Sequence, residues 1–255
     1  MRRSTFESFD GTEIAYYQWG DDDAATPPVV LHHGFAANAL ANWVTPGVVD
    51  ALTAAGHRVV GIDARGHGTS GKSDDPARYG DAKMSRDLSG LFDVLGADRV
   101  HLAGYSMGGV VSLVTAGQDK RVERLVVGGI GGRVVQPAAP GGRQATDVMV
   151  AALLAEDPNT VPVAGRGLRA LADRVGADRP SLAAIARADR TDAVDVDAIT
   201  APTLVLVGQD DAIAADPEVL AAAIGGGAQL RLLSGDHLSA LQDPRFVSSI
   251  VDFFA

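Results

Sequence analysis

The chain has 255 residues, of which 46% are hydrophobic and 21% are charged, a composition typical of a globular protein rather than a disordered one. Its formal net charge of -10 disfavours nucleic acid and anionic membranes as partners, because an acidic surface repels phosphate groups. There is no cysteine, which excludes disulfides, thiolate catalysis and cysteine-based metal sites.

The N-terminus begins Met1-Arg2-Arg3 but continues without the apolar stretch of a signal peptide. No run of residues approaches the roughly 18 apolar residues that a membrane span needs. We therefore expect a cytoplasmic protein that acts on a small-molecule substrate and has neither nucleic-acid nor membrane partners. The sequence leaves the oligomeric state open.

The first half of the chain alternates between strands and helices. Residues up to Trp19 predict a hairpin that turns at Asp10-Gly11. Short apolar runs predict buried strands at 29–32, 58–62, 100–103 and 125–127. Helices are predicted between them at 48–55, 81–95 and 107–116. Continuous apolar strands that alternate with helices indicate a mostly parallel sheet with helices on both faces, an α/β fold.

The segment 131–200 interrupts this alternation. Glycines and prolines separate short helical pieces there, such as 144–155 and 181–188, and no strand of core type is found. The alternation then resumes with a strand at 203–207, a helix near 217–224, a strand at 229–233 and a terminal helix. We predict one core made of residues 1–130 and 201–255, with residues 131–200 forming a small helical cap.

A possible nucleophile lies in Gly104-Tyr105-Ser106-Met107-Gly108, which matches the pattern G-x-S-x-G. The pattern alone is a weak signal, but here it follows an apolar strand and opens directly into an apolar helix. That is the setting in which a nucleophilic serine lies on a sharp turn, and the flanking glycines let the backbone pack closely. An ordinary glycine-rich turn is the alternative, and the context argues against it.

A serine hydroxyl needs a base beside it, and of the six histidines only His237 follows Ser106 in the chain. His237 lies between a predicted strand and the last helix, at the carboxyl edge of the sheet. The base must be oriented by a carboxylate, and Asp210 and Asp211 follow the strand 203–207 at the same edge. The sequence therefore predicts a triad of Ser106, His237 and one of these two aspartates.

Five elements spread over nearly all of the chain resemble the α/β-hydrolase superfamily. They are the turn at Ser106 and the segments His32-His33-Gly34-Phe35, Asp63-Ala64-Arg65-Gly66-His67-Gly68-Thr69-Ser70, Gly208-Gln209-Asp210-Asp211 and Gly235-Asp236-His237. The resemblance implies the α/β-hydrolase fold, Asp211 as the acid, and an oxyanion hole made by the backbone N–H groups of Phe35 and Met107.

We expect no cofactor and no metal. His32 and His33 are adjacent on a predicted strand, so their side chains point to opposite faces and are not placed to chelate one ion. The resemblance gives the segment around His67 a structural role in shaping a loop near the sheet.

A second motif, Gly66 to Ser73, matches the nucleotide-binding pattern G-x-x-x-x-G-K-[ST]. A true phosphate-binding loop needs a helix that begins at Lys72-Ser73 and turns its N–H groups toward the phosphates. Here Asp74 and Asp75 follow, and no apolar helical periodicity appears before about residue 81. We therefore do not expect a nucleotide site.

The predicted function is that of a carboxylic ester hydrolase, which cleaves small to medium, moderately hydrophobic esters through an acyl-enzyme. Candidate pocket residues are Trp43, Tyr105, Val134, Met149 and Leu153. The sequence around His237 also resembles enol-lactonases, and a cofactor-free perhydrolase or a C–C hydrolase would use the same triad. From another class, a ligand-binding protein with little turnover on a hydrolase scaffold is the alternative.

Overall fold

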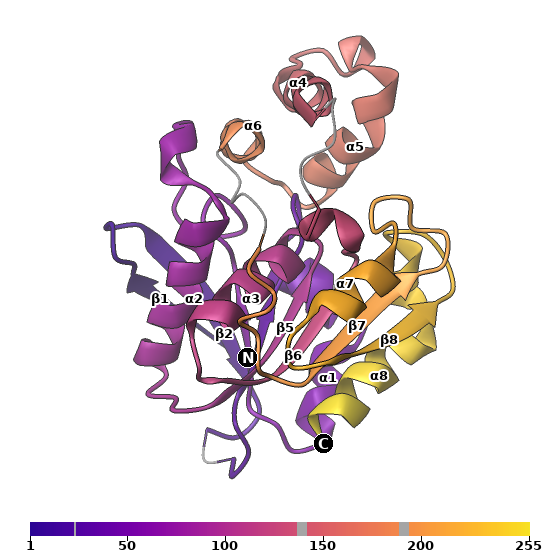
Figure 1. Ribbon diagram of the computed structural model, residues 1–255. Helices are drawn as coiled ribbons and strands as arrows, with labels where there is room; N and C mark the ends of the chain where they lie inside the picture. Colours follow the sequence, from indigo (N-terminus) through magenta and orange to yellow (C-terminus); the bar gives the residue numbers. More distant parts are fainter. Residues whose placement is uncertain (23, 137–141, 189–193) are drawn as a thin grey trace.

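A computed structural model describes residues 1–22, 24–136, 142–188 and 194–255. An eight-stranded sheet in the order β1-β2-β4-β3-β5-β6-β7-β8 forms its centre (Figure 1). The strands are β1 Arg2–Glu7, β2 Glu13–Trp19, β3 Val29–His32, β4 Val59–Ile62, β5 Val100–Tyr105, β6 Val122–Gly128, β7 Thr203–Gly208 and β8 Ala228–Leu233.

Strands β1 and β2 form the predicted hairpin, and β2 pairs antiparallel with β4. All other pairs, from β4 through β3 and β5 to β8, are parallel. Every residue of β3, β4 and β5 is buried, as expected for central strands that are covered on both faces. The predicted mostly parallel α/β sheet is confirmed.

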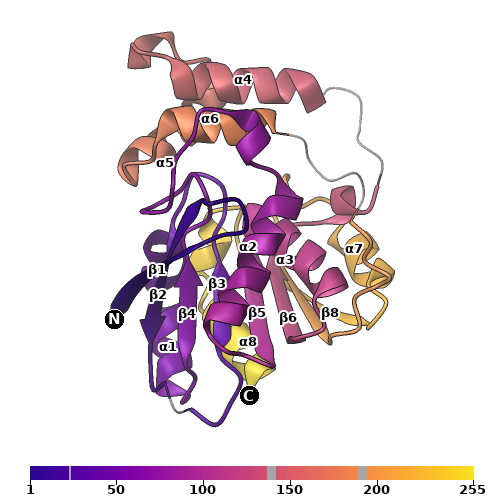
Figure 2. The ribbon, with the colours of Figure 1, turned by 90° about the vertical axis from the view of Figure 1, so that its left-hand side faces the viewer.

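Helices cover both faces of the sheet (Figures 1 and 2). On one face, α1 (Val48–Ala54) and α8 (Pro244–Phe254) pack over an apolar core. On the other face, a larger apolar core lies beneath α2 (Asp81–Val94), α3 (Met107–Gln118) and α7 (Pro217–Ala223). The helices thereby cover the central strands, whose ends stay clear of these two layers.

Three further helices, α4 (Gly142–Leu154), α5 (Arg166–Arg174) and α6 (Arg179–Arg187), lie beyond one end of the sheet (Figures 1 and 2). The backbone N–H of Ser73, in the loop after β4, donates to Ser181 Oγ of α6 at 3.2 Å. These helices therefore lie over the carboxyl edge of the strands.

The helices α4 and α6 correspond to the predicted segments 144–155 and 181–188, whereas α5 was not predicted. Its nine residues include four charged ones, and the guanidinium of Arg169 is buried among them. Leu168, Leu171 and Ala172 recur at helical spacing and pack against the core, but the pattern spans only nine residues, which is short for a helix assignment from sequence. The predicted cap 131–200 includes residues 137–141 and 189–193, which lie outside the described part of the chain, so its boundaries stay a prediction.

Short helical turns complete the connections. One is a π-helical turn, η1, at Leu40–Val44. The others are 3-10 turns, namely η2 Pro76–Arg78, η3 Gly132–Val134, η4 Pro158–Thr160, η5 Val163–Gly165 and η6 Ser239–Gln242.

Within the described ranges, no helix combines the length and the apolar character needed to cross a membrane.

Candidate active site

Ser106 occupies a sharp turn between β5 and α3. Its φ of 53° and ψ of -116° form a conformation that is strained for a residue with a side chain. A Cβ atom on Gly104 would overlap the carbonyl oxygen of Gly108, and one on Gly108 would overlap that of His32. The turn therefore requires both glycines of the G-x-S-x-G pattern, and it projects Ser106 from the carboxyl edge of the sheet.

The side chains of Ser106, His237 and Asp211 form one chain of hydrogen-bonding contacts. His237 Nε2 lies 2.9 Å from Ser106 Oγ, and His237 Nδ1 lies 2.7 Å from Asp211 Oδ2. The three residues follow β5, β8 and β7, respectively. The carboxyl ends of parallel strands in one sheet thus bring together residues that are up to 131 positions apart in the sequence.

The carboxylate of Asp211 is buried beneath His237. Its Oδ1 accepts the backbone N–H groups of Ile213 at 2.9 Å and Ala214 at 3.2 Å. Burial would raise the pKa of Asp211, but the hydrogen bonds from His237 and from these two N–H groups outweigh it and hold the pKa below its usual value. Asp211 therefore stays ionised and fixes the orientation of the imidazole.

The structure also separates the two candidate aspartates. Asp211 reaches His237, whereas Asp210 is exposed and donates its backbone N–H to Gly235 O at 3.0 Å. Because successive residues at a strand end point in different directions, only one of the pair reaches the site.

The loop that carries His237 is held by its neighbours. Tyr105 Oη donates to the carbonyl oxygen of His237 at 2.7 Å, and the two rings lie with their centroids 5.5 Å apart. Gly129 has a φ of 64°, and a Cβ atom there would lie 3.0 Å from His237 Cε1. Asp236 Oδ1 accepts the N–H groups of Leu238 and Ser239. These contacts set the position of the imidazole beside Ser106.

The two predicted oxyanion donors lie on opposite sides of Ser106 in the chain. Met107 is the first residue of α3, so its N–H has no partner within the helix. Gly34, just before Phe35, lies close to the turn at Ser106: a Cβ atom built on Gly34 would be 3.4 Å from Ser106 Cβ. Across the described residues, no hydrogen bond engages the backbone N–H of Phe35 or of Met107. Both groups are therefore available to an oxygen bound at Ser106.

Asn42, in η1, is a further residue of this region. Its Oδ1 accepts the backbone N–H of Gly34 at 3.0 Å. No motif in the sequence marks Asn42, since a single asparagine before a tryptophan carries neither periodicity nor a spacing rule.

The five candidate pocket residues occupy different places. Trp43 is 1% exposed and stacks on Phe246, at a centroid distance of 6.2 Å and an interplanar angle of 18°. Trp43 is therefore a core residue on the α8 face and does not line the site, contrary to the prediction. Its large apolar ring is buried more favourably against Phe246 than at a solvent-filled pocket. Tyr105 lies against His237 and acts on the loop, and Leu153 is fully buried. Val134 and Met149 are partly buried and remain candidates.

The segment around His67 shapes loops, as the resemblance implied. Asp63 follows β4 and accepts the backbone N–H groups of Ala39 at 3.0 Å and Thr69 at 2.8 Å. Gly68 has a φ of 47°, and a Cβ atom there would overlap the Asp63 carboxylate. The segment therefore ties the loop after β3 to the loop after β4.

The pattern that resembles a phosphate-binding loop has a different geometry. Lys72 Nζ donates to the carbonyl oxygens of His67, Gly68 and Ser70 at 2.5 to 2.9 Å, so its three protons are used within its own loop. No helix begins at Lys72 or Ser73, and the next helical turn is η2 at Pro76–Arg78. This stretch therefore lacks the helix N-terminus that binds phosphate.

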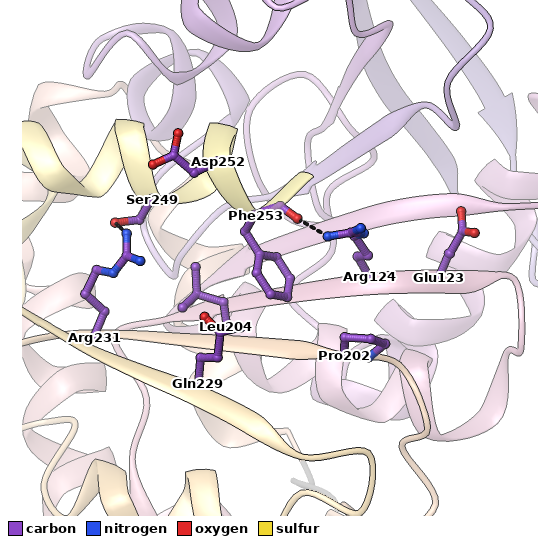
Figure 3. A pocket seen from close by; sticks show the side chains of 9 residues that line it. All are labelled: Glu123, Arg124, Pro202, Leu204, Gln229, Arg231, Ser249, Asp252 and Phe253. Carbon is purple, nitrogen blue, oxygen red and sulfur yellow. Dashed lines mark hydrogen bonds between the residues drawn. The ribbon is translucent and has the colours of Figure 1, made fainter. Parts of the chain in front are cut away.

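A surface groove of about 540 Å³ lies away from the triad, between β7, β8 and α8 (Figure 3). Its two arginines are bound by the protein itself: Arg124 donates to Phe253 O and Arg231 to Ser249 Oγ, each at 2.6 Å. None of the triad residues lines it.

In the part of the chain that the structure describes, no group of three His, Asp or Glu side chains is arranged to hold a metal ion.

Comparisons with known proteins agree with this fold. Residues 27–148 match the family model of the alpha/beta hydrolase fold. The chain is 41% identical over 113 residues to the sn-1-specific diacylglycerol lipase ABHD11 of Mus musculus, a match that covers 44% of this chain and 35% of that protein. The chain thus spans well under two thirds of the length of the curated relatives it matches.

Two solved structures match over almost the whole chain. A hydrolase from Pseudomonas aeruginosa PA01 has a TM-score of 0.80 at 28% identity, covering 99% of this chain and 98% of that one. The enol-lactonase from Burkholderia xenovorans LB400 has a TM-score of 0.74 at 27% identity, covering 98% and 99%. The likeness therefore extends through the helices over the carboxyl edge.

Proposed function

We propose that this chain, which belongs to the α/β-hydrolase superfamily, is a serine hydrolase that cleaves carboxylic esters. Hydrolases are among its relatives and structural neighbours, including a lipase and an enol-lactonase. The observation that carries the proposal is the chain of contacts from Ser106 Oγ through His237 to Asp211, at 2.9 Å and 2.7 Å.

In the proposed first half-reaction, Ser106 Oγ attacks the carbonyl carbon of the ester while His237 Nε2 takes the hydroxyl proton. Asp211 holds the Nδ1 proton and stabilises the imidazolium that forms. The N–H groups of Phe35 and Met107 bind the developing oxyanion, and each such donor contributes about 3 to 4 kcal/mol to transition-state stabilisation. The C–O bond then breaks as His237 returns the proton to the leaving alcohol, which leaves an acyl group on Ser106.

The second half-reaction uses the same groups. His237 removes a proton from a water molecule, the resulting hydroxide attacks the acyl carbon, and the same N–H groups bind the oxyanion. Collapse of this intermediate releases the carboxylic acid and returns the proton to Ser106.

The proposed substrates are uncharged esters with small to medium, moderately hydrophobic groups. The support is the apolar character of the candidate lining residues Phe35, Val134 and Met149, which are partly buried and pack against the larger core. Hydrophobic walls with a few placed polar groups are typical of sites for such ligands.

A lactone is the second candidate substrate. The full-length match to the enol-lactonase favours it. A lactone is a cyclic ester, so the same steps apply, except that the leaving alcohol stays attached to the acyl group and both are released together as one hydroxy acid.

Hydrolysis of p-nitrophenyl acetate and butyrate tests the proposal, with a Ser106→Ala variant of matched circular dichroism as control. We expect release of p-nitrophenol by the wild-type protein alone. Equal, slow release by both proteins would overturn the proposal and favour a ligand-binding protein on this scaffold.

A further inference from the structure

In the loop after β3, two of three consecutive backbone N–H groups donate hydrogen bonds to buried side chains. The N–H of Gly34 donates to Asn42 Oδ1 at 3.0 Å, and the N–H of Ala36 donates to His67 Nε2 at 3.3 Å. The N–H of Phe35, between them, has no partner among the described residues. The two hydrogen bonds hold the backbone on both sides of Phe35 and leave its N–H, within the described chain, as the free donor among the three.

Asn42 is placed for its oxygen atom. Its side chain is buried in the π-helical turn η1, and its Nδ2 has no hydrogen-bond partner among the described residues. A buried donor without a partner lowers stability, and a leucine of similar size would avoid that loss. The hydrogen bond that Asn42 Oδ1 accepts from the N–H of Gly34 therefore explains why this position holds an asparagine.

His67 is placed for an unprotonated ring nitrogen. Its Nδ1 faces the carbonyl oxygen of Arg65 at 3.1 Å and so carries the proton, which leaves Nε2 as the acceptor for Ala36. The ring is fully buried, and this burial, with the electrostatic repulsion between His67 and His33 when both are protonated, lowers the pKa of His67 well below its usual value. His67 therefore stays neutral and keeps accepting this hydrogen bond.

The loop needs such support because its backbone is strained and in contact with the nucleophile. Ala36 has a φ of 57°, in the left-handed region that non-glycine residues rarely adopt. At the other end, the position of a Cβ atom on Gly34 would be 3.4 Å from Ser106 Cβ. A shift of this loop therefore moves the N–H of Phe35 relative to the reacting carbonyl.

We propose that Asn42 and His67 are positioning residues that clamp the loop from both sides and aim the N–H of Phe35 at the oxyanion. This inference rests on the proposed serine-hydrolase function. Neither residue is proposed to touch the substrate, since each acts through the backbone of the loop.

The test compares Asn42→Leu with Trp43→Phe, a change at the next residue that alters the core away from the site. For Asn42→Leu we expect kcat on p-nitrophenyl butyrate to fall on the order of 10-fold to 100-fold, with KM within about twofold. For Trp43→Phe we expect a lower melting temperature and an unchanged kcat. An unchanged kcat for Asn42→Leu would overturn the inference, and so would an equal fall in kcat for Trp43→Phe at an equal loss of stability.

Amide hydrogen exchange measured by NMR tests the clamp without turnover. In the wild-type protein we expect the Phe35 amide to exchange faster than those of Gly34 and Ala36, and in Asn42→Leu we expect Gly34 to lose its protection. A Phe35 amide protected as strongly as its neighbours would overturn the clamp. A wild-type protein that hydrolyses no ester contradicts the proposed function instead, and the exchange pattern then decides the clamp alone.

Discussion

Tyr105 Oη donates a 2.7 Å hydrogen bond to the carbonyl oxygen of His237, and so joins the residue before the nucleophile to the loop that carries the base. Burial raises the pKa of Tyr105, which keeps this phenol protonated as a donor. The turn and the loop are thus joined by this hydrogen bond and by the contact of the two rings, in addition to the triad itself.

Replacing Tyr105 by phenylalanine keeps the ring beside His237 and removes only this hydrogen bond. We expect a loss of about 1 kcal/mol in the free energy of unfolding, because the carbonyl of His237 loses its partner. We also expect kcat to fall about 3-fold to 10-fold as the imidazole becomes less well placed. Urea unfolding and ester kinetics measure the two effects, and a fully active variant would show that the loop is held by other contacts.

The two adjacent aspartates form a matched pair. Asp211→Asn keeps the shape of the side chain but offers the wrong partner to His237 Nδ1, so we expect kcat to fall on the order of 10³-fold to 10⁴-fold. Asp210→Asn changes an exposed residue and should leave kcat unchanged. Ester kinetics on both variants decide the assignment, and the reverse order of effects would give the role to Asp210.

Arg65 stabilises the fold through a buried ion pair. Its guanidinium contacts Asp87 at 2.7 Å and Asp10 at 2.9 Å, and both Arg65 and Asp87 are buried. We expect Arg65→Leu to lower the free energy of unfolding by about 3 to 5 kcal/mol, because Asp87 is left as a buried charge without its partner.

The control for this change is Arg99→Leu, which removes an exposed ion pair with Glu123. It should lower the free energy of unfolding by at most about 1 kcal/mol. Chemical denaturation of both variants measures the difference. Similar losses for the two would mean that the contacts of Arg65 contribute little to stability.

Buried histidines make stability depend on pH. Burial lowers the pKa of His32 to about 3 and that of His101 to about 4, and it also lowers the pKa values of His33 and His67. In the unfolded chain these side chains take up protons near their usual pKa of 6.5. Below that pH the unfolded state therefore binds more protons than the folded state.

The free energy of unfolding should accordingly be constant above pH 7 and fall as the pH drops from 6.5 toward 4. Each histidine contributes a slope of up to about 1.4 kcal/mol per pH unit. His101→Phe keeps the ring that stacks on Phe254 and should reduce the slope by the share of one histidine. A slope that is the same in wild type and variant would show that His101 is protonated in the folded protein.

Local patterns were enough to predict the sheet, its covering helices, and the two residues Ser106 and His237, whose side chains the structure places 2.9 Å apart. The apolar runs of β3, β4 and β5 predict buried strands, because both faces of these strands are covered. The glycines around Ser106 predict the sharp turn, because a side chain there would overlap the backbone. The choice between Asp210 and Asp211 came from the family resemblance, and the structure then placed Asp211 beside His237.

Features that depend on tertiary contacts were not predicted. Trp43 was expected at the pocket, but an aromatic residue near a functional loop has the same sequence signature whether it faces the site or Phe246. The roles of Asn42 and Gly129 also depend on which loops meet at the carboxyl edge. Nothing in the local sequence specifies that meeting.

The proposed mechanism depends above all on Ser106 as the nucleophile and on His237 as the base that activates it. Reaction with a fluorophosphonate, followed by peptide mass spectrometry, tests it most directly, because the reagent forms a stable adduct with an activated serine. We predict one adduct, on Ser106, that is absent from Ser106→Ala and forms far more slowly in His237→Ala. A folded wild-type protein that is labelled on another residue, or not at all, would contradict the account.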